Sequence, residues 1–299
     1  MIRDARLVAF QRCLRLGYLA HFLREWVTLR PFWSQDFRDA FLVFGKPAAV
    51  RFALAWFGVA AVAQLVASAQ ALLRPTRQLL WICTFGLMLE ALVMPIGMPN
   101  HVALMLAALG LQAVMLLWRN DEPGTVRGLC ALSIAGYASA ALHKMNSGFI
   151  EVLAGVLGHR LPHSLAVALA LGAIAIELGV PILAFASARA RPVLLLVLLA
   201  LHFPMNSTLG AVDYPWIATS FYPLYFNAQE WAQIEAELLR PGRAQWLCAA
   251  LAVALFLLLT PRDLFIYQAG MGLLVSALWG YATPSLLRRV GALLPAGAA

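Results

Sequence analysis

Residues 127–146 have the sequence RGLCALSIAGYASAALHKMN, an apolar run that ends in a single cationic side chain, Lys144. About 20 predominantly apolar residues cross the hydrocarbon core of a bilayer as a helix. A charge in that core costs about 2.5–3.5 kcal/mol on insertion scales, so an intramembrane lysine marks a candidate functional site. Burial favours the neutral amine, which can act as a general base. The alternative is that the amine extends to the lipid headgroups from the helix end.

The composition of the whole chain agrees with a membrane protein. It has 299 residues, of which 62% are hydrophobic and 12% charged, with a mean hydropathy of +0.79. We therefore expect an all-α, polytopic transmembrane helical bundle forming a single integral membrane domain over residues 1–299. The net charge of +8 comes from basic residues that lie singly or in pairs between apolar stretches, which excludes a nucleic-acid partner. The four cysteines are widely separated and no HExxH motif occurs, so neither a disulfide framework nor a metal site is expected.

Apolar stretches of spanning length predict eight transmembrane helices. Residues 7–29 form a ninth candidate, although their arginines also fit an amphipathic helix in the interface. The eight spans lie near residues 52–73, 79–98, 101–118, 127–146, 165–187, 193–211, 244–260 and 264–283.

Arginines in alternate loops predict how the helices are oriented. Loops that carry Arg74 and Arg77, Arg119 and Arg127, Arg189 and Arg191, and Arg262 are expected on the cytoplasmic side. The opposite loops are then 99–100, 147–164 and 212–243. Within them, residues 149–163 and 216–239 are expected to form short amphipathic or re-entrant segments on the non-cytoplasmic side, where either could act as a lid.

This orientation brings three polar clusters to the non-cytoplasmic ends of their helices. They are Asn100-His101, Lys144 to Ser147, and Asn206 to Tyr214. Tyr137 precedes Lys144 by seven residues and therefore lies on the same helix face. His202 and Asn206 are four residues apart and share a face beside Pro204.

Each of these clusters also has a purely structural interpretation. Asn100 can serve as a helix N-cap, and His202 with Asn206 can form hydrogen bonds between helices without any chemistry. Glu90 and Glu177 are the two carboxylates placed well within apolar spans. Glu177 could hold Lys144 or a histidine by a charged hydrogen bond, or it could pair with an arginine.

Three of these segments resemble a known family. Residues 142–149, Leu-His-Lys-Met-Asn-Ser-Gly-Phe, resemble the lysine motif of the vitamin K-dependent gamma-glutamyl carboxylases and the bacterial horizontally transferred transmembrane (HTTM) family. Lys144 matches the family's catalytic lysine. Asn100-His101 resembles the family's Asn/His pair, and His202, Met205-Asn206-Ser207 and Tyr214-Pro215-Trp216 resemble its later polar stretch. The recognisable motifs cover residues 100–226.

The chain also departs from that family's pattern. His143 replaces a second lysine of the animal carboxylases, and the spacing between His202 and Asn206 is one residue longer. We expect a minimal form that lacks the large extramembrane domain of the animal enzymes. Because that domain recognises their protein substrates, the resemblance does not imply a propeptide-bearing substrate.

The resemblance implies a membrane-embedded carboxylase-like enzyme. It would use a reduced quinone, of the vitamin K hydroquinone or menaquinol type, with O2 and CO2 as co-substrates. Lys144 would take a proton from the hydroquinone, oxygen would add, and the resulting base would remove a carbon-bound proton before CO2 is captured. His101 and His202 are expected to orient the quinone oxygens. The expected binding and supporting residues are Tyr137, Asn100, Asn146, Asn206, Glu177 and Tyr214.

The same resemblance implies a location and partners. The chain would lie in a bacterial inner membrane, and the loop arginines then predict that its active-site face is toward the periplasm. Its partners would be the bilayer, the lipophilic quinone, and a small secreted peptide or a partner membrane protein. Two other hypotheses remain open: a quinone-linked redox or peptide-maturation protein, and a non-catalytic bundle that binds a quinone, a lipid or a toxin peptide.

Overall fold

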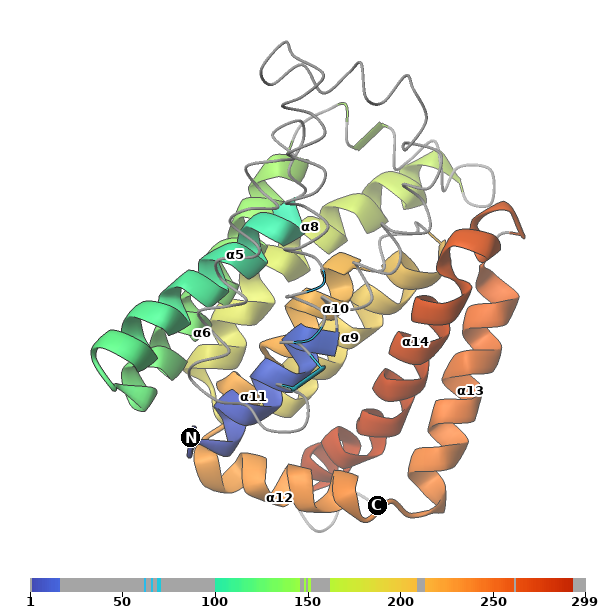
Figure 1. The fold of residues 1–299 in the computed structure, drawn as a ribbon. Helices are drawn as coiled ribbons and strands as arrows, with labels where there is room; N and C mark the ends of the chain where they lie inside the picture. Colours follow the sequence, from blue (N-terminus) through green and yellow to red (C-terminus); the bar gives the residue numbers. More distant parts are fainter. Residues whose placement is uncertain are drawn as a thin grey trace. The chain divides into compact units, whose positions relative to one another are not determined.

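The computed structural model describes residues 2–16, 62, 66, 69–70, 100–145, 148, 150–151, 162–208, 213–260 and 262–292. Every regular element within these ranges is a helix, which confirms the all-α class (Figure 1). The predicted span near 79–98 and most of the one near 52–73 lie outside the described residues. Of the predicted ninth candidate, residues 7–16 are described, and they belong to a helix over residues 5–16.

The helix boundaries agree with the predicted apolar stretches to within a few residues, except at the start of α6 and the end of α14. Residues 216–239, predicted not to span, form three short helices. The bounds are α5 (Asn100–Gln112), η2 (Ala113–Trp118), α6 (Glu122–Lys144), α8 (His163–Ala186), α9 (Arg191–Thr208), α10 (Asp213–Ser220), α11 (Tyr222–Tyr225), α12 (Ala228–Leu239), α13 (Arg243–Leu259) and α14 (Arg262–Gly291). Of these, η2 is a π-helix that continues α5.

Two of the described helices, α6 and α8, are long and apolar enough to cross a membrane. A third crossing is obtained if α12 and α13, which meet at 81°, are counted as one bent span. The described part of the chain is therefore compatible with a membrane protein, but it does not support a count of eight or nine spans.

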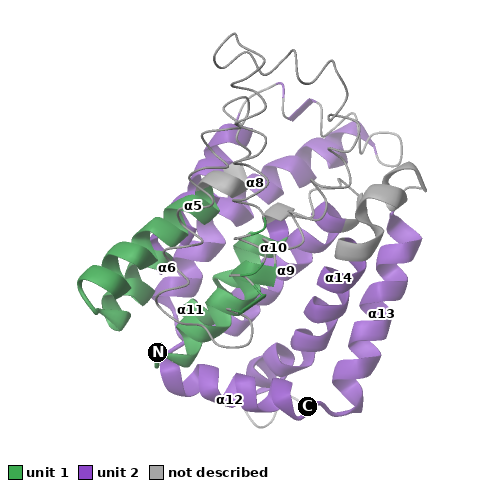
Figure 2. Cartoon of the chain, in the orientation of Figure 1, with its two compact units in different colours: residues 1–129, 216–224, 263–271 green, residues 130–215, 225–262, 272–299 purple. Residues whose placement is uncertain are grey.

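The chain divides into two compact units (Figure 2). Unit 1 contains residues 1–129, 216–224 and 263–271. Unit 2 contains residues 130–215, 225–262 and 272–299. All contacts described below join residues of the same unit.

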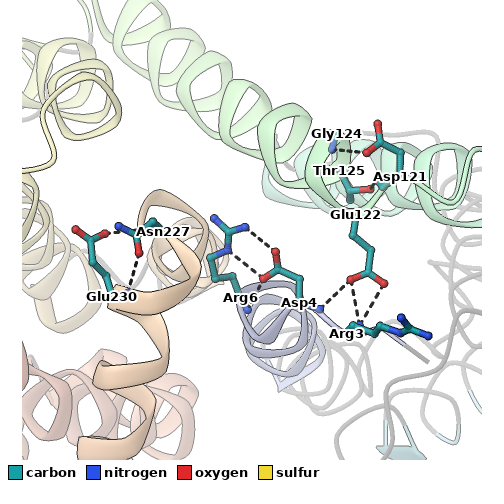
Figure 3. Close-up of polar contacts among 9 residues, drawn as sticks. All are labelled: Arg3, Asp4, Arg6, Asp121, Glu122, Gly124, Thr125, Asn227 and Glu230. Carbon is teal, nitrogen blue, oxygen red and sulfur yellow. Dashed lines mark hydrogen bonds and ion pairs between the residues drawn. The ribbon is translucent and has the colours of Figure 1, made fainter.

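In unit 1, the start of α6 is fixed by carboxylates (Figure 3). Asn120 precedes the helix with φ 53°, a left-handed conformation that asparagine tolerates. Asp121 then accepts a hydrogen bond from the backbone N–H of Gly124 at 2.8 Å, as an N-cap does. Glu122 accepts from the backbone N–H groups of Arg3 and Asp4, the latter at 2.8 Å. The N-terminal segment is thereby attached to the beginning of α6.

In unit 2, α13 and α14 approach each other closely because small residues face the contact. A Cβ added at Gly280 would lie 2.4 Å from the carbonyl oxygen of Cys248 and 2.8 Å from the Cα of Ala249. A Cβ added at Gly272 would lie 2.1 Å from the ring of Phe256. Helices in membranes use such small residues to bring their backbones into contact.

Helix α12 is held at the ends of neighbouring helices by ion pairs. Its N-cap Asn227 and Glu230 form a capping box (Figure 3), and Glu230 also pairs with Arg191 at 2.9 Å. Near its other end, Glu237 pairs with Arg288 at 2.7 Å and with Arg289 at 3.1 Å. Helix α12 therefore lies beside the start of α9 and the end of α14.

This position corrects the predicted orientation of the loops. Residues 187–191 and 212–243 were predicted on opposite sides, yet the Arg191–Glu230 pair places α12 at the same end of unit 2 as the α8–α9 turn. The prediction is wrong because the chain is back at that end by the start of α12, a return that the mixed aromatic and polar residues of 213–225 do not reveal. We call this end the arginine-rich end; its arginines are Arg189, Arg191, Arg240, Arg243, Arg288 and Arg289.

Candidate functional site

Lys144 is bound by Glu177. The amine, at the last residue of α6, donates to both carboxylate oxygens of Glu177, which lies in the middle of α8, at 2.5 Å to Oε2. The Glu177 side chain is 1% exposed and the Lys144 side chain 18% exposed. Of the two alternatives for Glu177, the pair with Lys144 is confirmed. The amine does not extend to the headgroups as a lone cation.

A second polar pair lies on the same face of α6. The Tyr137 hydroxyl is 2.7 Å from Nε2 of His202 in α9, and both side chains are buried. Tyr137 and Lys144 are seven residues apart, as the predicted shared face requires. Helix α6 therefore joins α9 through Tyr137 and α8 through Lys144.

Glu177 and His202 lie at similar distances along their helices from the arginine-rich end. Glu177 is nine residues before the end of α8, and His202 is eleven residues after the start of α9. At 1.5 Å per residue these separations are about 13 Å and about 16 Å. If α8 crosses the membrane, Glu177 lies near the middle of a hydrocarbon core about 30 Å thick.

Asn206 connects the site to α14. It lies one turn after His202, is fully buried, and its amide nitrogen donates to the carbonyl of Gly272 at 3.2 Å and to the hydroxyl of Ser276 at 3.0 Å. The ring of Trp279, one turn further along α14, lies 6.3 Å from the His202 ring. His202 and Asn206 share one face of α9, as predicted. Ser276 and Trp279 of α14 lie beside that face.

Sequence reasoning missed these α14 residues and one further pair on α6. The Tyr225 hydroxyl donates to Ser133 at 3.2 Å, and Ser133 lies one turn before Tyr137 on the α6 face. A signal was available in the sequence, because Gly272, Ser276 and Gly280 recur every four residues within an apolar helix. That spacing indicates a packed face and not a lipid-exposed one.

Several predicted site residues lie beyond what the structure describes. Asn146 is outside the described residues. For His101, Asn100 and Tyr214 only the backbone is described, as the first turn of α5 and the start of α10. The described part of the candidate site therefore comprises five residues, all in unit 2: Lys144, Glu177, Tyr137, His202 and Asn206. Among the described residues, no group of three His, Cys, Asp or Glu side chains could hold a metal ion.

The Lys144–Glu177 pair can hold one proton in two positions. The proton lies either on the amine, opposite a carboxylate, or on the carboxyl group, opposite a neutral amine. Neither position leaves a net charge in the low-dielectric interior, where an unpaired ion would be costly. In the second position Lys144 has a lone pair that can accept a proton from a ligand.

No protein-family model, curated protein or solved structure matches this chain. The resemblance to the carboxylase family therefore rests on the residues quoted from the sequence alone.

Proposed function

We propose that this chain is a membrane-embedded, quinone-dependent, carboxylase-like enzyme in which Lys144 removes a proton from a reduced quinone. The observation that carries the proposal is the ion pair of Lys144 with the buried Glu177, on the α6 face that also carries the Tyr137–His202 pair. An ionisable residue within a membrane-spanning helix is a candidate functional site.

The residues present fit a quinone ring. His202 and Tyr137 supply hydrogen-bonding groups, Asn206 supplies an amide, and the aromatic ring of Trp279 lies beside His202. Ligand sites commonly combine such apolar walls with a few polar groups. A bound reduced quinone would supply, together with O2, a base strong enough to remove a carbon-bound proton from the substrate that is carboxylated.

The chain's own residues would handle the first proton. With the shared proton on Glu177, the neutral amine of Lys144 accepts the proton of a ring hydroxyl, and the protonated carboxyl group remains hydrogen-bonded to the ammonium. The Tyr137 hydroxyl, which His202 holds by a hydrogen bond, orients a ring oxygen. Surrounding helices exclude the water that would quench a strong base. His101, Asn100, Asn146 and Tyr214 are proposed to complete the site on the strength of the resemblance.

The orientation of the protein is part of the proposal. The arginine-rich end would face the cytoplasm of a bacterial inner membrane, in accordance with the positive-inside rule. The site would then be reached from the periplasmic side, where a small secreted peptide or a partner membrane protein could supply the substrate.

The test is turnover by purified protein. Protein in lipid nanodiscs is incubated with reduced menaquinone or vitamin K hydroquinone, labelled bicarbonate and Glu-containing peptides. We expect quinone oxidation and label uptake in the original chain, and a loss of at least about 100-fold in Lys144→Ala, the usual scale of general-base catalysis. The exposed Arg243→Ala is the matched control and should retain full activity. Equal rates in the original chain and Lys144→Ala would overturn the proposal, and quinone oxidation without label uptake would leave the redox hypothesis.

One observation favours a second candidate, the non-catalytic binding bundle. Both Glu177 oxygens contact the Lys144 amine, as in an ion pair that only joins two helices. On this hypothesis Lys144→Ala lowers stability but changes no reaction, and quinone or lipid binding persists. Measuring quinone affinity and thermal stability in the same variant separates the two functions.

A further inference from the structure

Asn206 is held in one orientation by α14. Its amide nitrogen has two hydrogens and donates both, one to the Gly272 carbonyl and one to the Ser276 hydroxyl. The Gly272 carbonyl can only accept, so a flipped amide would place two oxygens against each other. The carbonyl oxygen Oδ1 of Asn206 therefore keeps its position on the other side of the amide.

This oxygen has no hydrogen-bond donor among the residues that the structure describes. The Asn206 side chain is fully buried. A buried acceptor without a donor costs about 1–3 kcal/mol, and native structures rarely leave one without a partner. Because the amide oxygen can only accept, the missing partner must be a hydrogen-bond donor.

The neighbours of Asn206 indicate what kind of donor fits. His202 lies one turn away on the same face of α9, its ring bonded to Tyr137 and 6.3 Å from the ring of Trp279. These aromatic groups suit a planar, apolar ring, and the pairs around them supply hydrogen bonds at its edge.

We infer that Asn206 Oδ1 accepts a hydrogen bond from a ring hydroxyl of the reduced quinone and thereby selects the reduced over the oxidised form. The inference rests on the proposed function. A reduced quinone carries two hydroxyl donors, whereas the oxidised form carries only carbonyl acceptors, which would leave Oδ1 unpaired beside another oxygen. Sites built to pair with a ligand hydroxyl reject analogues that lack it, because the buried group then loses its partner.

The test compares ligands before it compares variants. Equilibrium dialysis under anaerobic conditions, with nanodisc-embedded protein, gives the Kd of one short-chain naphthoquinone in three forms: oxidised, reduced, and the dimethyl ether of the reduced form, which has the same ring without donors. We expect the reduced form to bind at least about tenfold more tightly than the other two, the effect of one satisfied buried hydrogen bond.

The variants assign that preference to Asn206. Asn206→Leu, of similar size, should weaken binding of the reduced form about tenfold and leave the oxidised form within about twofold. Ser276→Ala is the matched control, since it removes one anchor of the amide but keeps Oδ1 and the Gly272 contact, and it should retain the preference. Thermal unfolding confirms that each variant is folded, and the three-ligand comparison in the original chain needs no variant.

The outcomes separate this inference from the proposed function. Equal affinities for the three ligands, or an equal loss for both redox forms in Asn206→Leu, would overturn the role of Asn206 while leaving Lys144 as the proposed base. Binding of no form would overturn both. A preference for the reduced form that depends on Asn206, in a protein that shows no turnover, would support the inference and defeat the catalytic proposal.

Discussion

The Lys144–Glu177 pair is stabilising only as long as both partners are present. Glu177 is 1% exposed, and its two oxygens contact the Lys144 amine. Breaking a buried pair by removing one partner leaves an uncompensated charge, whereas replacing both partners by apolar side chains is often neutral. The pair therefore makes separate predictions for single and double substitutions.

Lys144→Met should lower the stability by about 3–5 kcal/mol, because Glu177 loses its cation in the interior. The double variant Lys144→Met/Glu177→Leu should recover most of that loss while remaining inactive. Thermal unfolding of the purified proteins in one detergent measures the effect. A double variant as unstable as the single one would show that the two side chains act independently.

At the residue scale, the sequence predicted which side chains share a helix face, and it offered several partners for Glu177 without selecting among them. Tyr137 with Lys144, and His202 with Asn206, follow from helical spacing alone. The choice of Glu177 for Lys144 and of His202 for Tyr137 depends on how α6, α8 and α9 pack, which periodicity does not specify. Ser276 and Trp279 were missed for the same reason, since they belong to a helix far along the chain.

At the scale of helices, the contact between α13 and α14 depends on Gly280. Gly280→Ala should destabilise unit 2 and lower the unfolding temperature, because the added methyl group would lie 2.4 Å from the Cys248 carbonyl oxygen. The cost expected for overpacking is about 1–3 kcal/mol. Gly179→Ala in α8 is the control, since nothing lies within 4 Å of a Cβ at that position. Equal effects of the two substitutions would mean that the helices can separate without cost.

The attachment of α12 to α14 should depend on pH. Burial raises the pKa of Glu237, but hydrogen bonds and charges from Arg288 and Arg289 outweigh it, and the net pKa lies below its usual value of 4.5. A lowered pKa means that this contribution to stability is present above about pH 4.5 and is lost as the pH falls through the lowered pKa. Glu237→Gln should therefore reduce stability at neutral pH and remove part of the acid sensitivity, as read from unfolding temperatures between pH 3 and pH 7. An unchanged pH profile in Glu237→Gln would contradict this.

The helices themselves were largely predictable. Long apolar stretches bounded by Arg, Pro and Gly gave α8, α9 and α13 within a few residues. The return of the chain between α9 and α12 was not predictable, because residues 213–225 are too short and too mixed in composition to be recognised from sequence as a helical connection. Because that one segment was misjudged, the side of the membrane predicted for every later loop was wrong as well.

At the scale of the whole molecule, the arginine-rich end gives a consistent orientation for unit 2. With α12 and the end of α14 at the same end as the α8–α9 turn, the arginines of all three segments are gathered there. The loop assignment from sequence had divided them between two sides, which the positive-inside rule disfavours.

Labelling of single cysteines should confirm this arrangement. In a background without the four native cysteines, Ala188→Cys in the α8–α9 turn and Ala232→Cys in α12 should react with an impermeant maleimide from the same side of the membrane. Ser164→Cys, at the opposite end of α8, should react from the other side. All three positions are exposed. If Ala232→Cys instead reacted from the same side as Ser164→Cys, residues 212–243 would lie opposite the α8–α9 turn, as the sequence predicted.

The close contact of α13 and α14 also restricts how a lipid-soluble ligand can reach Asn206. Where even one added carbon would collide with the Cys248 carbonyl or the Phe256 ring, no isoprenoid tail can pass between the two helices. A quinone that diffuses laterally from the lipid must therefore enter unit 2 between another pair of helices. A covalent cross-link that joins α13 to α14 should accordingly leave quinone uptake intact, as measured by the rate at which bound ligand appears.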